Sequence, residues 1–222
     1  MTLETIEITT PNCNAIKDFY ENILELPSEI IDEKTIAITI GNATLKFIET
    51  QEKSKSIYHL AFNIPKNKLE EAIQWSKNRM ELIEKKNEVL IADFESWNAN
   101  SVYFFDCDGN LLEFIARHDL DNATTEPFGS NQILNISEIG IVTEKPDEYA
   151  QNLMEKYGLQ LFEKNQNSEI FSAIGDDNGL LIVVKSKRNW FPTEIPAESN
   201  WTRIKLQHLD KKIELDINPT NN

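Results

Sequence analysis

The sequence predicts an α+β fold made of tandem modules, each with the order strand, helix, strand, strand, strand. The first observation is an internal repeat. LETIEITT and NAIKDFYENILELP near the start are matched by ISEIGIVT and DEYAQNLMEKYGLQL in the second half, so that Ile6 falls opposite Ile139. The second observation is that apolar residues change, in each copy, from the two-residue alternation of a strand to helical spacing and back. An internal repeat fixes an architecture because each copy is one supersecondary unit.

The first module shows these elements in order. Residues 3–10 alternate, which predicts a strand with Ile6 and Ile8 on one face. The other face is then expected to hold four residues: Leu3, Thr5, Glu7 and Thr9. Residues 14–24 carry apolar side chains at helical spacing. Residues 36–40 alternate again, and a Gly-Asn pair supplies a turn before the strand TLKFIE.

The second module is expected over residues 56–117. IYHLAFNI predicts a strand, and residues 66–79 form an amphipathic pattern typical of a helix. SVYFFD and LLEFIAR predict two strands, separated by the strong turn signal Asp108-Gly109-Asn110. Residues 1–118 are therefore predicted to be one domain of paired modules.

The second half is expected to be shorter. The polar segment 119–132 contains a proline and a glycine and predicts a linker between two halves. A third module follows over residues 133–186. The fourth has room only for strands near residues 201–206 and in KIELDI, so the domain at 133–222 is predicted to be truncated.

Composition limits the classes of partner. The formal net charge of −15 disfavours nucleic acid and anionic membrane surfaces. It would favour a cationic ligand near the surface, or it serves solubility alone. No apolar run approaches the roughly 20 residues that span a bilayer, and no leader segment is expected at the start. Cys13 and Cys107 are expected to stay reduced, and the cytoplasm is the expected location.

His59 and Glu113 are the first candidate site residues. His59 lies in the middle of a predicted strand, and Glu113 lies on the strand after the Asp108-Gly109-Asn110 turn. Taken singly, a histidine in a strand is usually a hydrogen-bonded core residue, and a glutamate is usually solvated.

The surrounding motifs change this interpretation. IYHLAFNIP followed by a helix and then SVYFFDCDGNLLEFIAR resembles the vicinal oxygen chelate superfamily, which includes glyoxalases, bleomycin-resistance proteins and extradiol dioxygenases. DFYENILELP is similar to the helix and turn after the first strand in that superfamily. The resemblance covers residues 3–117, continues over 133–186 and fades beyond.

The resemblance implies an open cup of eight strands, formed by paired modules whose first and last strands carry the metal ligands. Carried over to this sequence, the four ligand positions fall at Thr5, Glu49, His59 and Glu113. Thr5 stands where the superfamily has a histidine, and its neutral hydroxyl is a poor ligand. Glu49, His59 and Glu113 would still suit zinc, nickel, manganese or iron(II), and would leave open positions for substrate.

Neighbouring residues have several interpretations. Glu7 shares a face with Thr5, about 6.6 Å along the strand, so it is a candidate metal ligand or base, or a solvated edge residue. Arg117 is a candidate to bind a substrate carboxylate, to neutralise Glu113 or to lie at the rim. Tyr103, Phe105 and Thr5 are expected to contact substrate, although strand aromatics are commonly plain core.

The second half offers a few further candidates. Glu138 falls opposite Thr5 in the repeat, and Arg203 falls opposite His59 if the shortened fourth module is aligned. Trp190 and Phe191 lie in an expected loop that could close over the cup, form an oligomer contact or simply pack. No second metal site is expected, and this half is predicted to serve packing or to cover the first cup.

The resemblance implies a divalent-metal-dependent enzyme of isomerase, lyase or epimerase type, acting on a small oxygenated substrate with Glu113 or Glu49 as general base. Ring-cleaving dioxygenase chemistry is weakened, because its iron site needs two histidines and one carboxylate. A metal-free binding protein of the bleomycin-resistance type and a relic with an empty cup remain alternatives, and a homodimer is compatible with each. No phosphate-binding glycine loop or serine-hydrolase elbow is present in the sequence.

Overall fold

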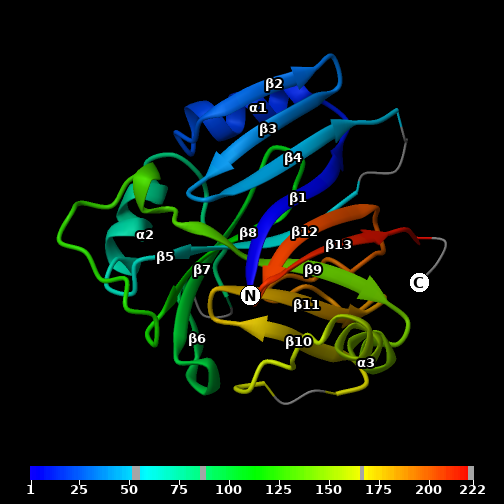
Figure 1. Ribbon diagram of the computed structural model, residues 1–222. Helices are drawn as coiled ribbons and strands as arrows, with labels where there is room; N and C mark the ends of the chain where they lie inside the picture. The colour runs from blue at the N-terminus through cyan, green and yellow to red at the C-terminus, as the bar shows by residue number, and fades with distance from the viewer. Residues whose placement is uncertain (52–55, 86–88, 166–167, 220–222) are drawn as a thin grey trace.

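The computed structural model describes residues 1–51, 56–85, 89–165 and 168–219, which form two curved sheets with three helices against their outer faces (Figure 1). The mixed α+β architecture and the curled open sheets confirm the predicted fold class. In the described residues, no helix is long and apolar enough to cross a membrane.

The first module has all five predicted elements. They are β1 (Thr2–Thr10), α1 (Cys13–Asn22), β2 (Ser28–Asp32), β3 (Thr35–Ile40) and β4 (Ala43–Glu49). The helix begins where the Asn12 side chain accepts hydrogen bonds from the backbone N–H groups of Asn14 and Ala15. Gly41 adopts a φ of 56° in the turn between β3 and β4, as the Gly-Asn signal indicates.

The second module repeats that order. Its elements are β5 (His59–Ile64), α2 (Leu69–Lys77), β6 (Ala92–Phe94), the short 3₁₀ helix η1 (Glu95–Trp97), β7 (Ala99–Phe105) and β8 (Leu111–Arg117). Asp106 shapes the turn between β7 and β8 by accepting hydrogen bonds from the backbone N–H groups of Asp108 and Asn110 and from the Asn110 side chain. Burial raises the pKa of Asp106 to about 6 despite these donors.

The later modules lose elements, as expected. After the short 3₁₀ helix η2 (Ser130–Gln132), the third module contains β9 (Asn135–Thr143), α3 (Pro146–Tyr157), β10 (Phe171–Asp176) and β11 (Gly179–Lys185). An isolated bridge between Leu161 and Ile174 stands where the second strand would be. The fourth module is a hairpin of β12 (Thr202–His208) and β13 (Lys211–Ile217).

The modules pair differently from the expectation that residues 1–118 enclose one cup. The six-stranded sheet has the order β13-β12-β1-β4-β3-β2, which joins modules one and four. The seven-stranded sheet has the order β10-β11-β9-β5-β8-β7-β6, which joins modules two and three. Periodicity assigns faces within a module but contains no information about which first strands become neighbours, because that pairing is long-range.

A bulge in β1 corrects the predicted face of Leu3. In the pairing with β12, Leu3 faces Leu206 and Thr5 faces Lys205, so one extra residue lies between them. A bulge changes which side chains share a face. Leu3 is consequently fully buried in the main core with Ile6 and Ile8, rather than lying on the face of Thr5.

Candidate metal centre and its cavity

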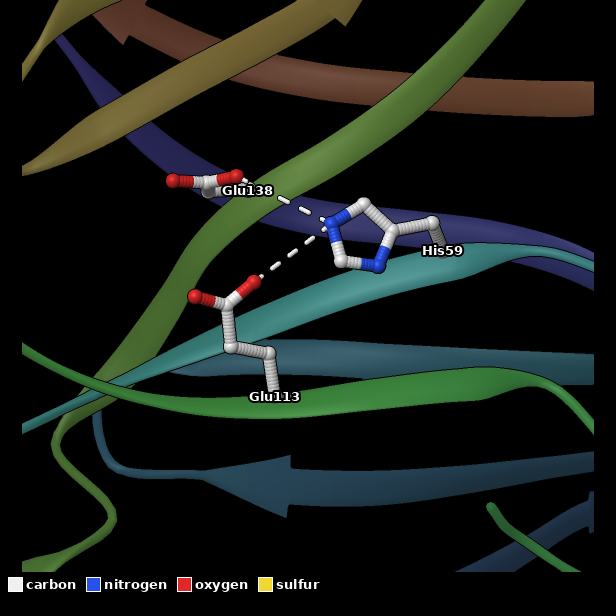
Figure 2. A group of neighbouring side chains, drawn as sticks. All are labelled: His59, Glu113 and Glu138. Carbon is white, nitrogen blue, oxygen red and sulfur yellow. Dashed lines mark ion pairs between the residues drawn. The ribbon is translucent and has the colours of Figure 1, made fainter. Parts of the chain in front are cut away.

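Three buried side chains converge on one point of the seven-stranded sheet. His59 comes from β5, Glu113 from β8 and Glu138 from β9 (Figure 2). The His59 Nε2 atom lies 3.6 Å from Glu113 Oε2 and 3.8 Å from Glu138 Oε2. One ligand atom from each residue lies within 4.8 Å of the others. This spacing is close enough for one ion to contact all three after small rotations of the side chains.

Strand register explains the convergence. Ala61 of β5 pairs with Glu113 on one side and with Glu138 on the other. Residues paired across a sheet share a face, and so do residues two apart on one strand, so His59 points to the same side as both glutamates. Ala61 is small and fully buried, and leaves space between the two carboxylates.

A bulge in β9 sets the position of Glu138. Ala61 pairs with Glu138, whereas its neighbour Phe62 pairs with Ile136, so Ser137 is the extra residue. The repeat places this bulge at the same point as the bulge in β1, since Ile136 and Glu138 correspond to Leu3 and Thr5. Bulges often direct a side chain into a site, and here the bulge accompanies the first-strand ligand position.

Hydrogen bonding leaves one nitrogen of His59 available for a cation. His59 Nδ1 lies 3.2 Å from the Leu111 carbonyl oxygen, which is a partner for Nδ1–H. This places the proton on Nδ1 in the neutral ring and directs the Nε2 lone pair at the two glutamates. Burial disfavours the charged ring, but the hydrogen bond to Glu138 and the charges of Glu113 and Glu138 outweigh it and raise the pKa of His59.

The two glutamates differ in electrostatic environment. Burial and the charge of Glu138 raise the pKa of Glu113 to about 7, against the opposing effect of His59. Burial also acts on Glu138, yet the hydrogen bond to His59 and the charge of Arg117 hold the pKa of Glu138 below its usual value. Glu113 Oε1 is buried and has no hydrogen-bond partner among the described residues. An orphaned carboxylate oxygen of this kind fits a site built for a cation.

Arg117 forms a buried ion pair with Glu138. Its side chain is fully buried and forms ion pairs with Glu138 and, at 3.4 Å, with Asp177. Its Nε donates to Ser137 Oγ at 3.2 Å. Of the roles considered from the sequence, this geometry corresponds to charge neutralisation, but of Glu138 rather than of Glu113.

A cavity of about 330 Å³ opens beside the three ligands. Its wall is largely aromatic, with six rings: Phe94, Trp97, Tyr103, Phe171, Trp190 and Phe191. The Trp190 ring centroid lies 5.3 Å from that of His59, and the Phe191 centroid lies 5.8 Å from that of Tyr103. Trp190 and Phe191 belong to the segment between β11 and β12, which therefore covers the candidate ligands.

Comparisons with known proteins identify the superfamily. No family model matches the chain. Metallothiol transferase FosB from two Staphylococcus epidermidis strains is 31% identical over 121 residues, which cover 49% of this chain and 82% of the relative. The chain belongs to the vicinal oxygen chelate superfamily.

Two solved structures, named as a dioxygenase and a glyoxalase, have a fold similar to that of this chain. A Bacillus subtilis protein named as a candidate dioxygenase has a TM-score of 0.59 and 16% identity over 83% of this chain. Glyoxalase I from Zea mays has a TM-score of 0.55 and 12% identity over 83% of this chain. The present chain spans 63% and 66% of the lengths of these two proteins.

Within the superfamily's duplicated plan, the equivalent positions of the two sheets carry opposite charges. In the seven-stranded sheet, Ala61 is flanked by Glu113 and Glu138. In the six-stranded sheet, Glu7 occupies that central place and is flanked by Lys46 and Arg203. Both cations form ion pairs with Glu7, at 3.7 and 3.4 Å. The first cup thus has cationic side chains where the second has carboxylates.

The same register explains why other predicted ligands lie elsewhere. Thr5, Glu7 and Glu49 all belong to the six-stranded sheet, and the described residues that could jointly hold an ion do not include them. Glu49 pairs with Thr10 at the end of β4, and its Oε2 accepts the N–H of Cys13 at 3.0 Å. It therefore stabilises the start of α1.

The remaining predicted residues separate into two groups. Tyr103 lines the cavity, while Phe105 is absent from the cavity lining and packs partly buried beside it. Glu138 was not proposed as a ligand from the sequence, although its alignment with Thr5 marked it as a first-strand position. The fourth equivalent position is Ile182, because Gly140, two residues after Glu138, pairs with it. Three of the four equivalent positions consequently carry candidate ligands, and the fourth is apolar.

A substitution at Gly140 tests how tightly Trp190 of the covering segment packs against β9. A Cβ atom there would lie 2.6 Å from Trp190 Cη2 and 3.3 Å from His59 Cβ. We expect Gly140→Ala to displace Trp190 and to lower the free energy of unfolding by about 1–3 kcal/mol, as overpacking typically does. Urea unfolding and acrylamide quenching of tryptophan fluorescence would measure both effects.

Gly129→Ala is the matched control, because a Cβ at Gly129 meets no heavy atom within 4 Å. Its stability should change by less than about 0.5 kcal/mol. Equal effects of the two substitutions would contradict close packing of Trp190 over Gly140.

Proposed function

We propose that this protein is a divalent-metal-dependent enzyme that acts on a small oxygenated substrate, with the ion held by His59, Glu113 and Glu138. The observation that carries the proposal is the buried group itself, in which an imidazole Nε2 and two carboxylates converge beside a cavity. One imidazole and two carboxylates suit zinc, nickel, manganese or iron(II). A bound divalent ion would polarise an oxygen of the substrate and stabilise negative charge that develops on it.

The chain's own residues supply the other functions. Glu113 is the candidate for proton transfer, because a metal-bound carboxylate can be displaced from the ion when substrate binds and can then accept a proton. Arg117 fixes the orientation of Glu138 through their buried ion pair. The aromatic wall, including Tyr103 and Trp190, excludes water and offers apolar surface to the substrate. Isomerase, lyase or epimerase chemistry uses these features directly, since each needs a proton moved beside an activated oxygen.

Group transfer is the second candidate. A relative that is 31% identical is named a metallothiol transferase, which favours transfer of a thiol to the oxygenated substrate. Ring-cleaving oxygenation is less favoured, because the group contains one histidine rather than two. Loss of free thiol, measured with a chromogenic disulfide, supports transfer. Exchange of a proton next to a carbonyl, measured by NMR in deuterated solvent, supports isomerase-type chemistry.

Metal content tests the proposal directly. We expect purified protein supplemented with zinc, manganese or anaerobic iron to keep about one ion per chain after desalting, as three protein ligands imply. His59→Ala, Glu113→Gln and Glu138→Gln should each lose it, because each removes one ligand. Elemental analysis of the desalted protein gives the stoichiometry, and circular dichroism verifies folding.

Glu7→Gln and Glu49→Gln are the matched controls, since they remove carboxylates from the other sheet. Both should keep the ion. Loss of metal in these controls, with retention in Glu138→Gln, would move the site to the first cup. Absence of metal from the wild-type protein under every supplementation would favour a metal-free binding protein.

A further inference from the structure

We propose that Arg188 selects an anionic substrate by pairing with a carboxylate group on a ligand that has an apolar body. The inference concerns the cavity of the proposed function and rests on it, but it assigns a substrate class and a residue that binds it. Arg188 lines the cavity together with the aromatic wall and the metal ligands.

The charges around the cavity leave Arg188 uncompensated. Arg117 is paired with Glu138 and Asp177, and Lys164 is paired with Asp177 and Asp119. A divalent ion would balance Glu113 and Glu138. Arg188 makes no ion pair with any residue that the structure describes, although the chain has 37 acidic and 22 basic residues. A cation without an ion-pair partner among the described residues, beside an acidic protein's cavity, is best explained by an anion supplied from outside.

The Arg188 side chain is held in place for such a role. Its guanidinium carbon lies 5.2 Å from the centre of the Phe171 ring, and the group is partly buried. Burial lowers the pKa of Arg188, as expected for a charge moved away from water without compensation. The Nη1 atom of Arg188 donates to the Asn189 carbonyl oxygen at 3.5 Å, which leaves the Nε and Nη2 edge of the planar group to donate two parallel hydrogen bonds to a carboxylate.

The main chain around Arg188 is also fixed. The N–H of Lys187 donates to the Ala197 carbonyl at 2.8 Å, and the N–H of Ala197 donates to the Arg188 carbonyl at 2.8 Å. These bonds join the two ends of the covering segment. These two hydrogen bonds fix the backbone of Arg188, so less conformational entropy is lost when a ligand binds.

The aromatic wall defines the rest of the ligand. Trp190, Phe171 and Phe191 line the same cavity as Arg188 and offer it apolar surface. A carboxylate for Arg188, with an apolar portion for the aromatic wall, defines a small organic acid.

Binding of a matched pair of probes tests the inference. The probes are 3-phenylpropionate and its neutral analogue 3-phenylpropionamide, titrated by calorimetry into zinc-loaded and into chelator-treated protein. We expect wild type to bind the carboxylate at least about tenfold more tightly than the amide in both forms, which corresponds to one charge-assisted contact. Arg188→Gln should abolish this preference, and Arg188→Lys should retain part of it.

Lys185→Gln controls for net charge, because it removes one exposed positive charge three residues away and outside the cavity lining. It should keep the preference. An equal affinity of wild type for both probes, or an unchanged preference in Arg188→Gln, would overturn the inference. A preference that disappears on chelation whatever residue is at position 188 would place the anion on the metal and also overturn it. An Arg188-dependent preference in a protein that never binds metal would uphold the inference while the proposed function fails.

Discussion

Replacing Arg117 with methionine is expected to lower the free energy of unfolding by about 3 kcal/mol or more, because removing one partner of a buried ion pair leaves uncompensated charge. Arg117 is completely buried and neutralises Glu138 and Asp177 at once. Its guanidinium also lies 5.7 Å from the Trp97 ring centre and 5.9 Å from that of Phe162. Urea unfolding of metal-free protein would measure the loss.

Arg203→Met is the matched control. Arg203 also belongs to a strand and forms ion pairs with Glu7, Glu214 and Asp216, but its side chain is 35% exposed. Exposed ion pairs contribute little, so we expect a loss below about 1 kcal/mol. Arg117→Met combined with Glu138→Gln should recover part of the stability, since the orphaned charge is then removed. Similar losses in the two single variants would contradict a special role for burial at Arg117.

Metal affinity is expected to fall steeply as the pH drops below about 7. His59 and Glu113 must both lose their protons to act as ligands, and the pKa of His59 is raised while that of Glu113 is about 7. Where both groups bear protons, two protons compete with one ion, so the apparent affinity should change by up to about 100-fold per pH unit. Zinc titrations by calorimetry in buffers of different ionisation enthalpy would count the protons released.

The stability of the metal-free protein should change with pH in the opposite direction to the metal affinity: it should fall as the pH rises. A group whose pKa is raised in the folded state stabilises it below the unfolded pKa, and this contribution is lost as the pH rises through the folded pKa. Glu113 should therefore make the metal-free protein less stable as the pH rises from about 4.5 to about 7, and His59 should do so as the pH rises above 6.5. The metal-loaded protein should gain stability over the same range. An affinity independent of pH, with no protons released near pH 6, would contradict these two groups as ligands.

The repeat and its periodicity were sufficient to predict the modules, because those signals are local. Alternation over residues 3–10 and helical spacing over residues 14–24 reflect one face of one element, and the structure has β1 and α1 there. The same local logic placed His59 on a first strand and Glu113 on a last strand of the second module. They belong to one module, so their proximity did not depend on how modules pair.

The third candidate ligand, Glu138, could not be predicted in this way. Glu138 meets His59 only because β9, and not β1, lies beside β5. The sequence contained a usable signal, since Glu138 aligns with Thr5 in the repeat and so occupies a first-strand ligand position. That signal was not used, because the prediction paired module two with module one, whereas the structure pairs it with module three. Glu49 illustrates a second obstacle, because its place at the end of β4 depends on strand register and not on composition.

The sequence by itself determined the repeated strand–helix–strand units, the shortened last module and the pair His59 and Glu113. Only the tertiary structure decided which modules share a sheet, and with that choice the third carboxylate, the burial of Arg117 beneath it and the covering of the site by Trp190. The physical reason is range: side-chain periodicity is set by a strand's own two faces. Pairing between modules is set by the burial and edge-to-edge hydrogen bonding of complete sheets.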